Sequence, residues 1–556
     1  MPLPNSDPTT GPDSAAAPNT PAAEQPELPA AILSPRALLA RDALLAAALL
    51  GITADPLLRN GPWGIGLLIW MLQFAATVVA LVRRDGRPLS REGSIWLGVA
   101  VFFAAGLSWR DAGLLHFFDV LAMLSALVLL AMSIDAIPVP GLAAARVRDL
   151  IRAAFGTGIS VATGVVPLLL HDAELHTTPR KSGEGSVRRI GRAVLIAAPV
   201  FVVFALLLTS ADPIFGSLVT LPDFRIDVAL SHVILAGFFA WVAAGWLRRS
   251  LLAQPASADA PATPLPLTLG STDVMLALGA LNALFAAFVL VQIGWLFGGE
   301  ALVLKTTGLS YAAYARRGFF ELMWVAGLLL PVLLGAHALI PDSDSRTLRL
   351  YRRLALPLVV LLGAILLSAG ARMKLYVHYY GISTDRLYAS AVMIWLAVVF
   401  AWLVFTVLRS RPRTFATGLV ASGFTVLFAL NVLNPDALVA RSNLARDTAA
   451  PAKTAGTDLK YVAWLGGDAV PMLVSALTAS GGAGSTTASS DDRCAAAATL
   501  LHRWSEEGRA GRYESWTQWN LARARAMRAV EAHEAELQKL ACSKSTTEVI
   551  SVPASP

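Results

Sequence analysis

Long apolar runs dominate the chain between residues 38 and 433. A helix of about 20 apolar residues can span a bilayer, because lipid offers the backbone no hydrogen-bond partner other than the helix itself. Ten clear runs cover residues 63–82, 94–109, 114–134, 190–210, 228–251, 274–297, 319–339, 354–371, 387–408 and 415–433. A weaker run at 37–55 carries Arg41 and Asp42. The pattern predicts an all-α fold, a polytopic transmembrane helix bundle of about 11 spans.

One segment leaves the number of spans open. Residues 150–170 are apolar enough to form a twelfth span, but they are rich in Gly, Ser and Thr and contain Pro167. A twelfth span would move the basic loops after residue 340 to the outside of the cell. Because Lys and Arg accumulate in cytoplasmic loops, the charge pattern favours a re-entrant or surface-lying segment.

Composition and charge support a membrane protein and indicate its orientation. Only 15% of the residues are charged, against about 25% in soluble domains. The net charge of +7 does not indicate nucleic-acid binding, because the basic residues lie in short loops between spans. Under eleven spans, one set of alternate loops holds more than twice as many Lys and Arg as the other. This bias predicts a cytoplasmic N-terminus and a C-terminus on the external side.

The ends of the chain differ in composition from the spans. Residues 1–36 are expected to be a disordered tail, 37–433 the transmembrane domain, 434–475 a membrane-proximal segment, 476–492 a flexible Gly/Ser/Thr linker and 493–556 a helical tail. Within the tail, 493–508 and 513–541 are predicted helices. The two cysteines, Cys494 and Cys542, are candidates for a disulfide if the tail is extracytoplasmic; the alternative is two buried thiols.

Few polar residues inside the spans suggest chemistry. His116 and Asp119 stand three residues apart on one predicted helix face, where they could relay protons or bind a cation. The alternative, an interhelical hydrogen bond that fixes packing, is favoured. The sequence holds no nucleotide-binding, zinc-protease or nucleophile motif, so no cofactor and no metal site is expected.

The densest polar stretch is 372–388, RMKLYVHYYGISTDRLY. An aromatic and basic belt at the membrane surface explains its tyrosines. It explains less well why Arg372, Lys374 and Arg386 lie on the side that is otherwise poor in positive charge. An anionic ligand or an anionic lipid headgroup held by these cations is the functional hypothesis.

Several motifs resemble a bacterial polytopic membrane family catalogued as domain of unknown function number forty-one seventy-three. They are SWRDAGLLHFFDVLAML (108–124), LFGG (296–299), YAAYARRGFFEL (311–322), YGISTDRLYASAVMIWLAVVFAW (380–402), NVLNPDALVARSNLAR (431–446) and DLKYVAWLGGDAVP (458–471). The resemblance implies a protein of the bacterial inner membrane and brings no known activity.

Under this topology the motifs map to the external ends of spans or to the external tail, at 296–322, 372–388 and 434–471, so we expect them to converge on one external polar site. Its candidate residues are Glu321, Arg317, Arg372, Tyr380, Asp385, Arg386, Asn434, Arg441, Asn443, Arg446 and Asp468. Three classes of function remain open: a binding, sensing or envelope-associated scaffold protein, a transporter of a small or lipid-linked anion, and a membrane enzyme acting on a lipid or envelope polymer. The first is favoured, because polar residues at mid-membrane depth and acid–base sets are scarce.

Overall fold

The computed structural model describes residues 34–134, 142, 145–173, 226–252, 268–307, 319–341, 343–409, 411, 413–447, 459–479, 489–507 and 512–541. By its contacts the chain divides into two units. The first, Met1–Pro35 with Glu174–Pro222, lies almost entirely outside the described residues. The second, Arg36–Ala173 with Asp223–Pro556, contains the elements discussed below. The predicted disordered tail, the predicted span 190–210 and most of the predicted linker fall outside the described residues.

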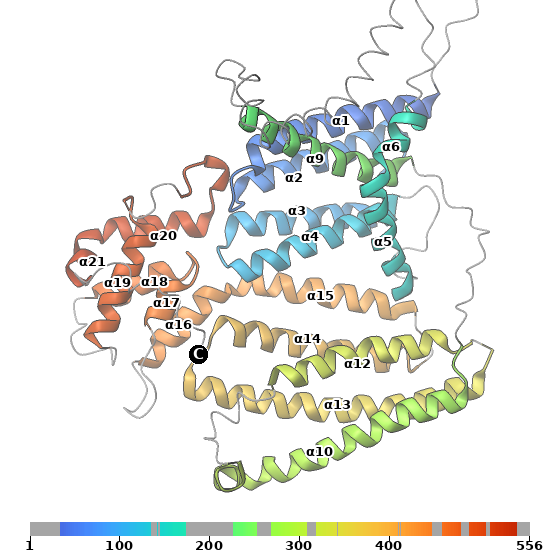
Figure 1. Ribbon diagram of the computed structural model, residues 1–556, viewed down its shortest axis with the longest axis vertical. Helices are drawn as coiled ribbons and strands as arrows, with labels where there is room; N and C mark the ends of the chain where they lie inside the picture. The colour runs from blue at the N-terminus through green and yellow to red at the C-terminus, as the bar shows by residue number, and fades with distance from the viewer. Residues whose placement is uncertain are drawn as a thin grey trace, which may run out of the picture. The chain divides into compact units, whose positions relative to one another are not determined.

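The described residues form helices and no strand, and ten of the helices are long and apolar enough to cross a membrane (Figure 1). These ten are α1 (Pro35–Leu58), α2 (Ile65–Arg84), α3 (Arg91–Trp109), α4 (Gly113–Ile134), α9 (Ile226–Leu251), α10 (Ser271–Thr307), α12 (Phe319–Leu339), α13 (Ser345–Tyr380), α14 (Thr384–Thr406) and α15 (Arg413–Leu433). The predicted all-α bundle of membrane helices is confirmed.

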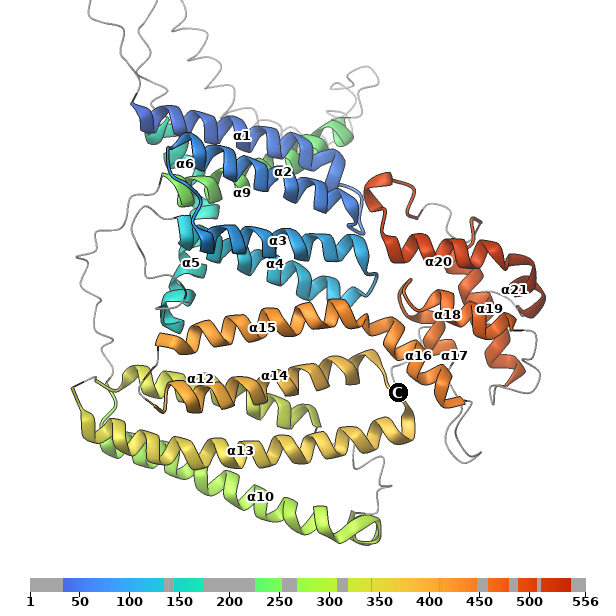
Figure 2. The ribbon, with the colours of Figure 1, turned by 180° about the vertical axis from the view of Figure 1, so that it is seen from behind.

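Two apolar cores hold the membrane helices together. One is built from α1 to α4 and α9, and the other from α10 and α12 to α14. Helix α15 lies between them in both ribbon views and contacts α4 on one side and α14 on the other (Figures 1 and 2). Large apolar side chains also point outwards; for example, Leu276, Trp324 and Leu367 are each more than 70% exposed. Apolar residues on both the inner and outer faces are what a helix bundle surrounded by lipid requires.

The segment predicted to be re-entrant or surface-lying begins and ends at one end of the bundle. It comprises α5 (Val147–Thr163), the short α6 (Val165–Pro167) and a π-helical turn (Leu168–Asp172), with a bend of 53° between its two parts. At its start, the Leu142 carbonyl accepts from Thr417 in the first turns of α15. At its finish, Asp172 pairs with Arg36 at the start of α1 and with Arg248 at the end of α9. The segment therefore returns to the end from which it starts, as the charge pattern predicts.

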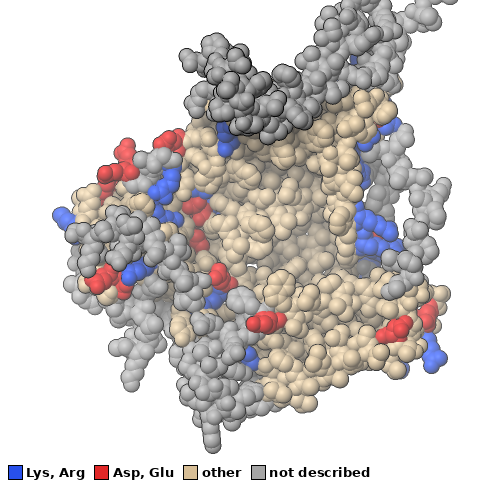
Figure 3. Space-filling model, in the orientation of Figure 1, with Lys and Arg blue, Asp and Glu red and all other residues tan. Residues whose placement is uncertain are grey.

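The two ends of the bundle differ in charge, and Figure 3 shows charged residues on two sides of a surface that is otherwise uncharged. We call one the arginine end. It carries the described residues Arg36, Arg41, Arg83, Arg84, Arg87, Arg91, Arg146, Arg148, Arg152, Arg248, Arg249, Arg346, Arg349, Arg352, Arg353, Arg409, Arg411 and Arg413. The opposite end, at which α3, α13 and α15 finish, is called the junction end.

Among the described residues, six α-helices and a 3₁₀ turn follow α15 at the junction end. They are α16 (Pro435–Asp447), α17 (Leu459–Trp464), α18 (Val470–Thr478), α19 (Ser490–Trp504), η2 (Trp516–Gln518), α20 (Leu521–Ala532) and α21 (Glu534–Leu540). They share a third apolar core that includes Trp504, Leu473 and Val530. We call residues 459–541 the C-terminal unit.

The predicted helix over 513–541 is wrong at its start and in its middle. Residues 516–518 form only a short 3₁₀ turn. The Asn520 side chain accepts from the backbone N–H groups of Ala522 and Arg523, which begins α20 at Leu521. A second break lies at His533, because α20 ends at Ala532 and α21 begins at Glu534. The expected single helix is therefore two shorter helices preceded by a turn.

Candidate functional site

Four charged side chains, two buried arginines and two half-buried aspartates, join the loop between α3 and α4 to the C-terminal unit. The Arg110 Nη1 lies 3.3 Å from an Asp468 carboxylate oxygen, and the Arg523 Nε lies 2.7 Å from an Asp111 carboxylate oxygen. Arg110 is 7% exposed and Arg523 is 2% exposed. We call these four residues the junction network. Two positive and two negative charges balance inside it, as buried ions require.

Backbone groups close the junction network on both sides. The Asp111 N–H donates to Asp468, and the Gly467 N–H donates to Asp111, each at 3.0 Å. The Arg110 Nε donates to the carbonyl of Asn431, 2.8 Å away in the last turn of α15. The network thus ties together α3, α15 and the turn before α18.

Two asparagines extend these contacts. Asn434, between α15 and α16, has a positive φ of 56° and donates to Asp468 at 2.8 Å. Asparagine tolerates this left-handed conformation better than most residues. Asn520 donates to the carbonyls of Leu107 and Arg110 while its side-chain oxygen caps α20. One side chain therefore begins a helix of the C-terminal unit and attaches it to the end of α3.

The Gly466–Gly467 pair allows the two parts to approach closely. A Cβ on Gly466 would lie 1.6 Å from the Asp111 carbonyl oxygen and 2.7 Å from an Asp436 carboxylate oxygen. The absence of a side chain lets the turn before α18 pack directly against the α3–α4 loop. This spacing also brings the Gly466 N–H within 2.8 Å of Asp436.

Asp436 is a buried carboxyl without a cationic partner in direct contact among the described residues. It lies in the first turn of α16 and is 4% exposed. Its pKa is raised to about 7, mainly by burial and to a smaller extent by the nearby charges of Asp468 and Asp111, whereas the Gly466 N–H acts to lower the pKa. The folded protein therefore binds this proton more tightly than the unfolded chain, whose carboxyl has a pKa near 3.8.

We expect Asp436→Asn to remove a pH-dependent contribution to stability. A raised folded-state pKa gives a contribution that is complete below pH ~4 and is lost as the pH rises through about 7. Thermal unfolding of the full chain in detergent should show that the midpoint of the variant rises relative to that of the wild type between pH 4 and 7. Above pH ~8 the difference between the two midpoints should be constant. Asp385→Asn, which changes an exposed carboxyl at the same end, should follow the wild type. Parallel curves for wild type and Asp436→Asn across this range would contradict the assignment.

A second polar cluster holds the loop between α13 and α14. The Asn443 amide donates to the Ile382 carbonyl at 2.8 Å and accepts from the Ile382 N–H at 3.0 Å. The Tyr461 hydroxyl accepts from the Thr384 N–H at 2.8 Å. Helices α16 and α17 thereby hold both sides of this turn, where Gly381 has a positive φ of 79°.

Arg386, a predicted anion-binding cation, is engaged inside this turn. It is 5% exposed, donates to the Gly381 carbonyl at 2.6 Å and lies over the Tyr376 ring. A cation beside the last carbonyls of a helix is favourable, because those carbonyls have no intrahelical donor. Its contacts with α13 explain a positive charge on the side that is otherwise poor in Lys and Arg.

The predicted site residues therefore do not form one open pocket. Asn434 and Asp468 belong with the junction network, whereas Arg386 and Asn443 belong to the second cluster. Arg372 donates to Gln292 on α10. Four others, Glu321, Tyr380, Asp385 and Arg441, are exposed. The side chains of Arg317 and Arg446 lie outside the described residues.

His116 and Asp119 have separate partners rather than forming a pair. Asp119, fully buried in α4, accepts from the Asn431 amide of α15 at 2.7 Å. The His116 Nε2 lies 2.7 Å from the Arg110 carbonyl oxygen. Gly106 of α3 lets three helices meet here, since a Cβ would lie 2.7 Å from Asp119. The contact between Asp119 and Asn431 is an interhelical hydrogen bond, the alternative that the sequence favours. The contact between His116 and the Arg110 carbonyl links α4 to the α3–α4 loop.

Cys494 lies in α19 and is disulfide-bonded. Cys542, the other cysteine of the sequence, lies outside the described residues. The described residues contain no group of three or more His, Cys, Asp or Glu side chains arranged to hold a metal ion.

Sequence reasoning misses most of the junction network. It does not select Arg110, Asp111, Asp436, Asn520 or Arg523 as site residues. One available signal is the cluster of both charge signs in SWRDAG directly after a span. Another is the Asn-Leu-Ala-Arg sequence at 520–523, which carries a helix-capping residue just before an apolar stripe.

Comparison with known proteins assigns the family. No curated protein and no solved structure matches the chain significantly. The family model described as "Domain of unknown function (DUF4153)" matches residues 97–476. The match confirms the expected membership in a family of unknown function; its number is forty-one fifty-three, whereas the motifs suggest forty-one seventy-three. It covers α3 to α18 and most of the junction contacts. The chain, a multi-pass membrane protein, belongs to the DUF4153 family.

Proposed function

We propose that this protein is a binding or scaffold protein of the bacterial inner membrane that presents the C-terminal unit on the external side. The contrast between the arginine end and the junction end supports this orientation, because Lys and Arg remain in the cytoplasm during insertion. A disulfide at Cys494 suits an oxidising compartment. Both features favour an external junction end and a cytoplasmic N-terminus.

The observation that carries the proposal is the saturation of the junction network by contacts within the protein. Arg110, Asp111, Asp468 and Arg523 are paired with one another and with backbone groups. Side chains that bind or transform a substrate need free donors or acceptors facing a cavity. These charges instead hold the C-terminal unit in one orientation on the membrane helices, which suits a scaffold or a sensor.

Exposed residues around the junction provide surfaces for partners and lipid. Trp516 and Trp519 are 64% and 47% exposed, and Trp63 in the α1–α2 loop is 39% exposed. The Ile65 N–H donates to the Trp519 carbonyl at 2.9 Å, which joins the backbone at the start of α2 to the backbone just after η2. Tryptophan is enriched at the level of lipid headgroups, so these side chains fit an anchor at the membrane surface. Asp385 and Arg441 remain exposed for a protein or envelope partner.

A transporter or an enzyme is less well supported by these contacts. A substrate that passed Asp119 and Asn431 would have to separate α3 from α4 and α15, because Gly106 of α3 packs closely against both side chains. An enzyme would need an unengaged acid–base set, whereas the charged residues of the junction network are mutually paired.

We expect Asp385→Cys and Arg441→Cys to react with a membrane-impermeant thiol photo-crosslinker in intact cells. Irradiation should then give a discrete adduct with an envelope component, because these exposed positions lie beside the C-terminal unit. Ser345→Cys, exposed at the arginine end, is the matched control and should react only after lysis. Adducts can be identified by mass spectrometry of the purified protein.

Two results would overturn the proposal. Reaction at Ser345→Cys but not at Asp385→Cys in intact cells would reverse the orientation. Reaction at the outer positions without a discrete adduct would remove the support for a binding or scaffold role.

A further inference from the structure

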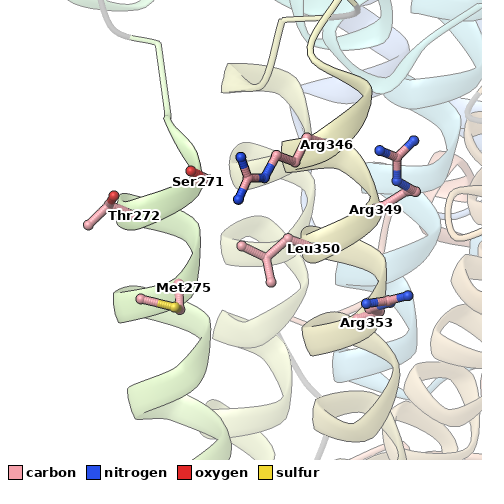
Figure 4. Close-up of a pocket in the computed structure, with 7 residues that line it drawn as sticks. All are labelled: Ser271, Thr272, Met275, Arg346, Arg349, Leu350 and Arg353. Atoms are coloured by element: carbon pink, nitrogen blue, oxygen red, sulfur yellow. The ribbon is translucent and has the colours of Figure 1, made fainter.

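An open pocket of about 430 Å³ lies at the arginine end, far along the chain from the junction residues. Its lining comes from the first turns of α10 and α13, and Figure 4 shows Arg346 reaching from α13 towards Ser271 on α10. The two helices pack together; for example, the Asn282 amide of α10 donates to the Leu354 carbonyl of α13 at 2.8 Å. The complete lining is Ser271, Thr272, Met275, Arg346, Arg349, Leu350 and Arg353.

The pocket concentrates the positive charge of three arginines, and among the described carboxylates Asp344 offsets part of the charge of Arg346. All three arginines are exposed, and none forms an ion pair within the described residues. Arg349 makes a long hydrogen bond, of 3.4 Å, to the Ser345 hydroxyl. Of the nearby described carboxylates, Asp344 accepts from Thr347 and interacts electrostatically with Arg346, and Asp273 accepts from the Gly270 N–H. The guanidinium groups therefore keep donors available for an anion.

The same face of α13 continues from the arginines into an apolar stripe. Arg346, Arg349, Arg353, Leu356 and Val360 are spaced by three or four residues, which places them along one side of a helix. Leu356 is 46% exposed and Val360 is 64% exposed. Cations at the membrane surface are thus followed by outward-facing apolar side chains towards the bilayer interior. This order matches a phospholipid, whose charged headgroup sits above its acyl chains.

We propose that this pocket binds the phosphate of a phospholipid headgroup. Arginine suits the ligand, because its planar guanidinium can donate two parallel hydrogen bonds to phosphate oxygens. The hydroxyls of Ser271 and Thr272 add donors from α10, while Met275 and Leu350 contact the upper part of an acyl chain. Basic pockets between membrane helices are suited to anionic lipid headgroups for the same electrostatic reason.

The test compares the full-length chain in detergent with the triple variant Arg346→Gln, Arg349→Gln and Arg353→Gln. Native mass spectrometry would measure binding of phosphatidylglycerol, of diacylglycerol with the same acyl chains, and of inorganic phosphate. The wild type should prefer phosphatidylglycerol to diacylglycerol. The triple variant should bind phosphatidylglycerol roughly 100-fold more weakly, since each basic residue near a lipid surface contributes about fivefold.

A matched control removes three arginines from the same end without touching the pocket. The triple variant Arg409→Gln, Arg411→Gln and Arg413→Gln has the same change in charge and should bind like the wild type. Met275→Trp, which fills the pocket and keeps its charges, gives an independent test if the first variant does not fold. It should weaken phosphatidylglycerol binding without lowering the thermal midpoint measured in the absence of lipid.

Three outcomes would overturn the assignment. They are unchanged phosphatidylglycerol binding by the pocket variants, an equal loss in the control variant, and displacement of the lipid by millimolar inorganic phosphate. The last would identify free phosphate as the ligand.

Discussion

Replacing Arg523 by methionine is expected to destabilise the attachment of the C-terminal unit by roughly 3–5 kcal/mol. The change leaves the Asp111 carboxylate, whose side chain is 13% exposed, without the Arg523 guanidinium that lies 2.7 Å away in the wild type. It also removes the donation from Arg523 to the Gln518 carbonyl and the contact with the Tyr513 ring. Thermal unfolding of the purified chain should show an early transition, and limited proteolysis should release the C-terminal unit at a lower temperature.

Two comparisons separate this effect from a general loss of charge. Arg525→Met changes an exposed arginine on the same helix and should stay within about 0.5 kcal/mol of the wild type. Adding Asp111→Asn to Arg523→Met should cost less than the sum of the two single changes, because the second change removes the unpaired charge. Strict additivity would mean that the two side chains do not stabilise each other.

Gly466→Ala is expected to cost roughly 3 kcal/mol or more, although it adds a single methyl group. The new Cβ would lie 1.6 Å from the Asp111 carbonyl oxygen, and a backbone atom cannot rotate away as a side chain can. The α3–α4 loop and the turn before α18 would have to separate, which would lengthen the Asp111 and Asp468 contacts. The yield of monodisperse protein and its thermal midpoint measure the effect.

Gly327→Ala is the matched control for this change. Gly327 lies inside α12, and a Cβ there would meet nothing within 4 Å. Alanine is the better helix former, so this variant should be as stable as the wild type or slightly more stable. Equal behaviour of the two variants would show that the junction can relax around the extra methyl group.

The membrane class can be predicted because its cause is local. Each span is recognisable from its own length and hydrophobicity, and the cost of an unpaired backbone in lipid permits little besides a helix. The same holds for the segment 150–170. Its interruption by Pro167 and the charge of the later loops are enough to favour a segment that returns to its own side.

Predictions from the local sequence fail where a side chain has a partner in another part of the fold. Arg386 is predicted to be an external cation that binds an anion, yet it donates to a carbonyl at the end of α13 and lies over the Tyr376 ring. The segment 513–541 is predicted to be one helix, yet Asn520 donates to carbonyls at the end of α3 and caps the helix that begins at Leu521.

By itself, the sequence determined an all-α membrane protein, the places of its described spans and the asymmetry of charge between its two ends. Only the tertiary structure decided that Asp111 meets Arg523 and that Arg110 meets Asp468, although more than 350 residues separate each pair. It alone placed Arg346, Arg349 and Arg353 against the start of α10. Hydropathy and charge act along the chain, so one segment reveals them. A buried ion pair or a pocket depends on which helices pack together, and that choice comes from the whole set of contacts.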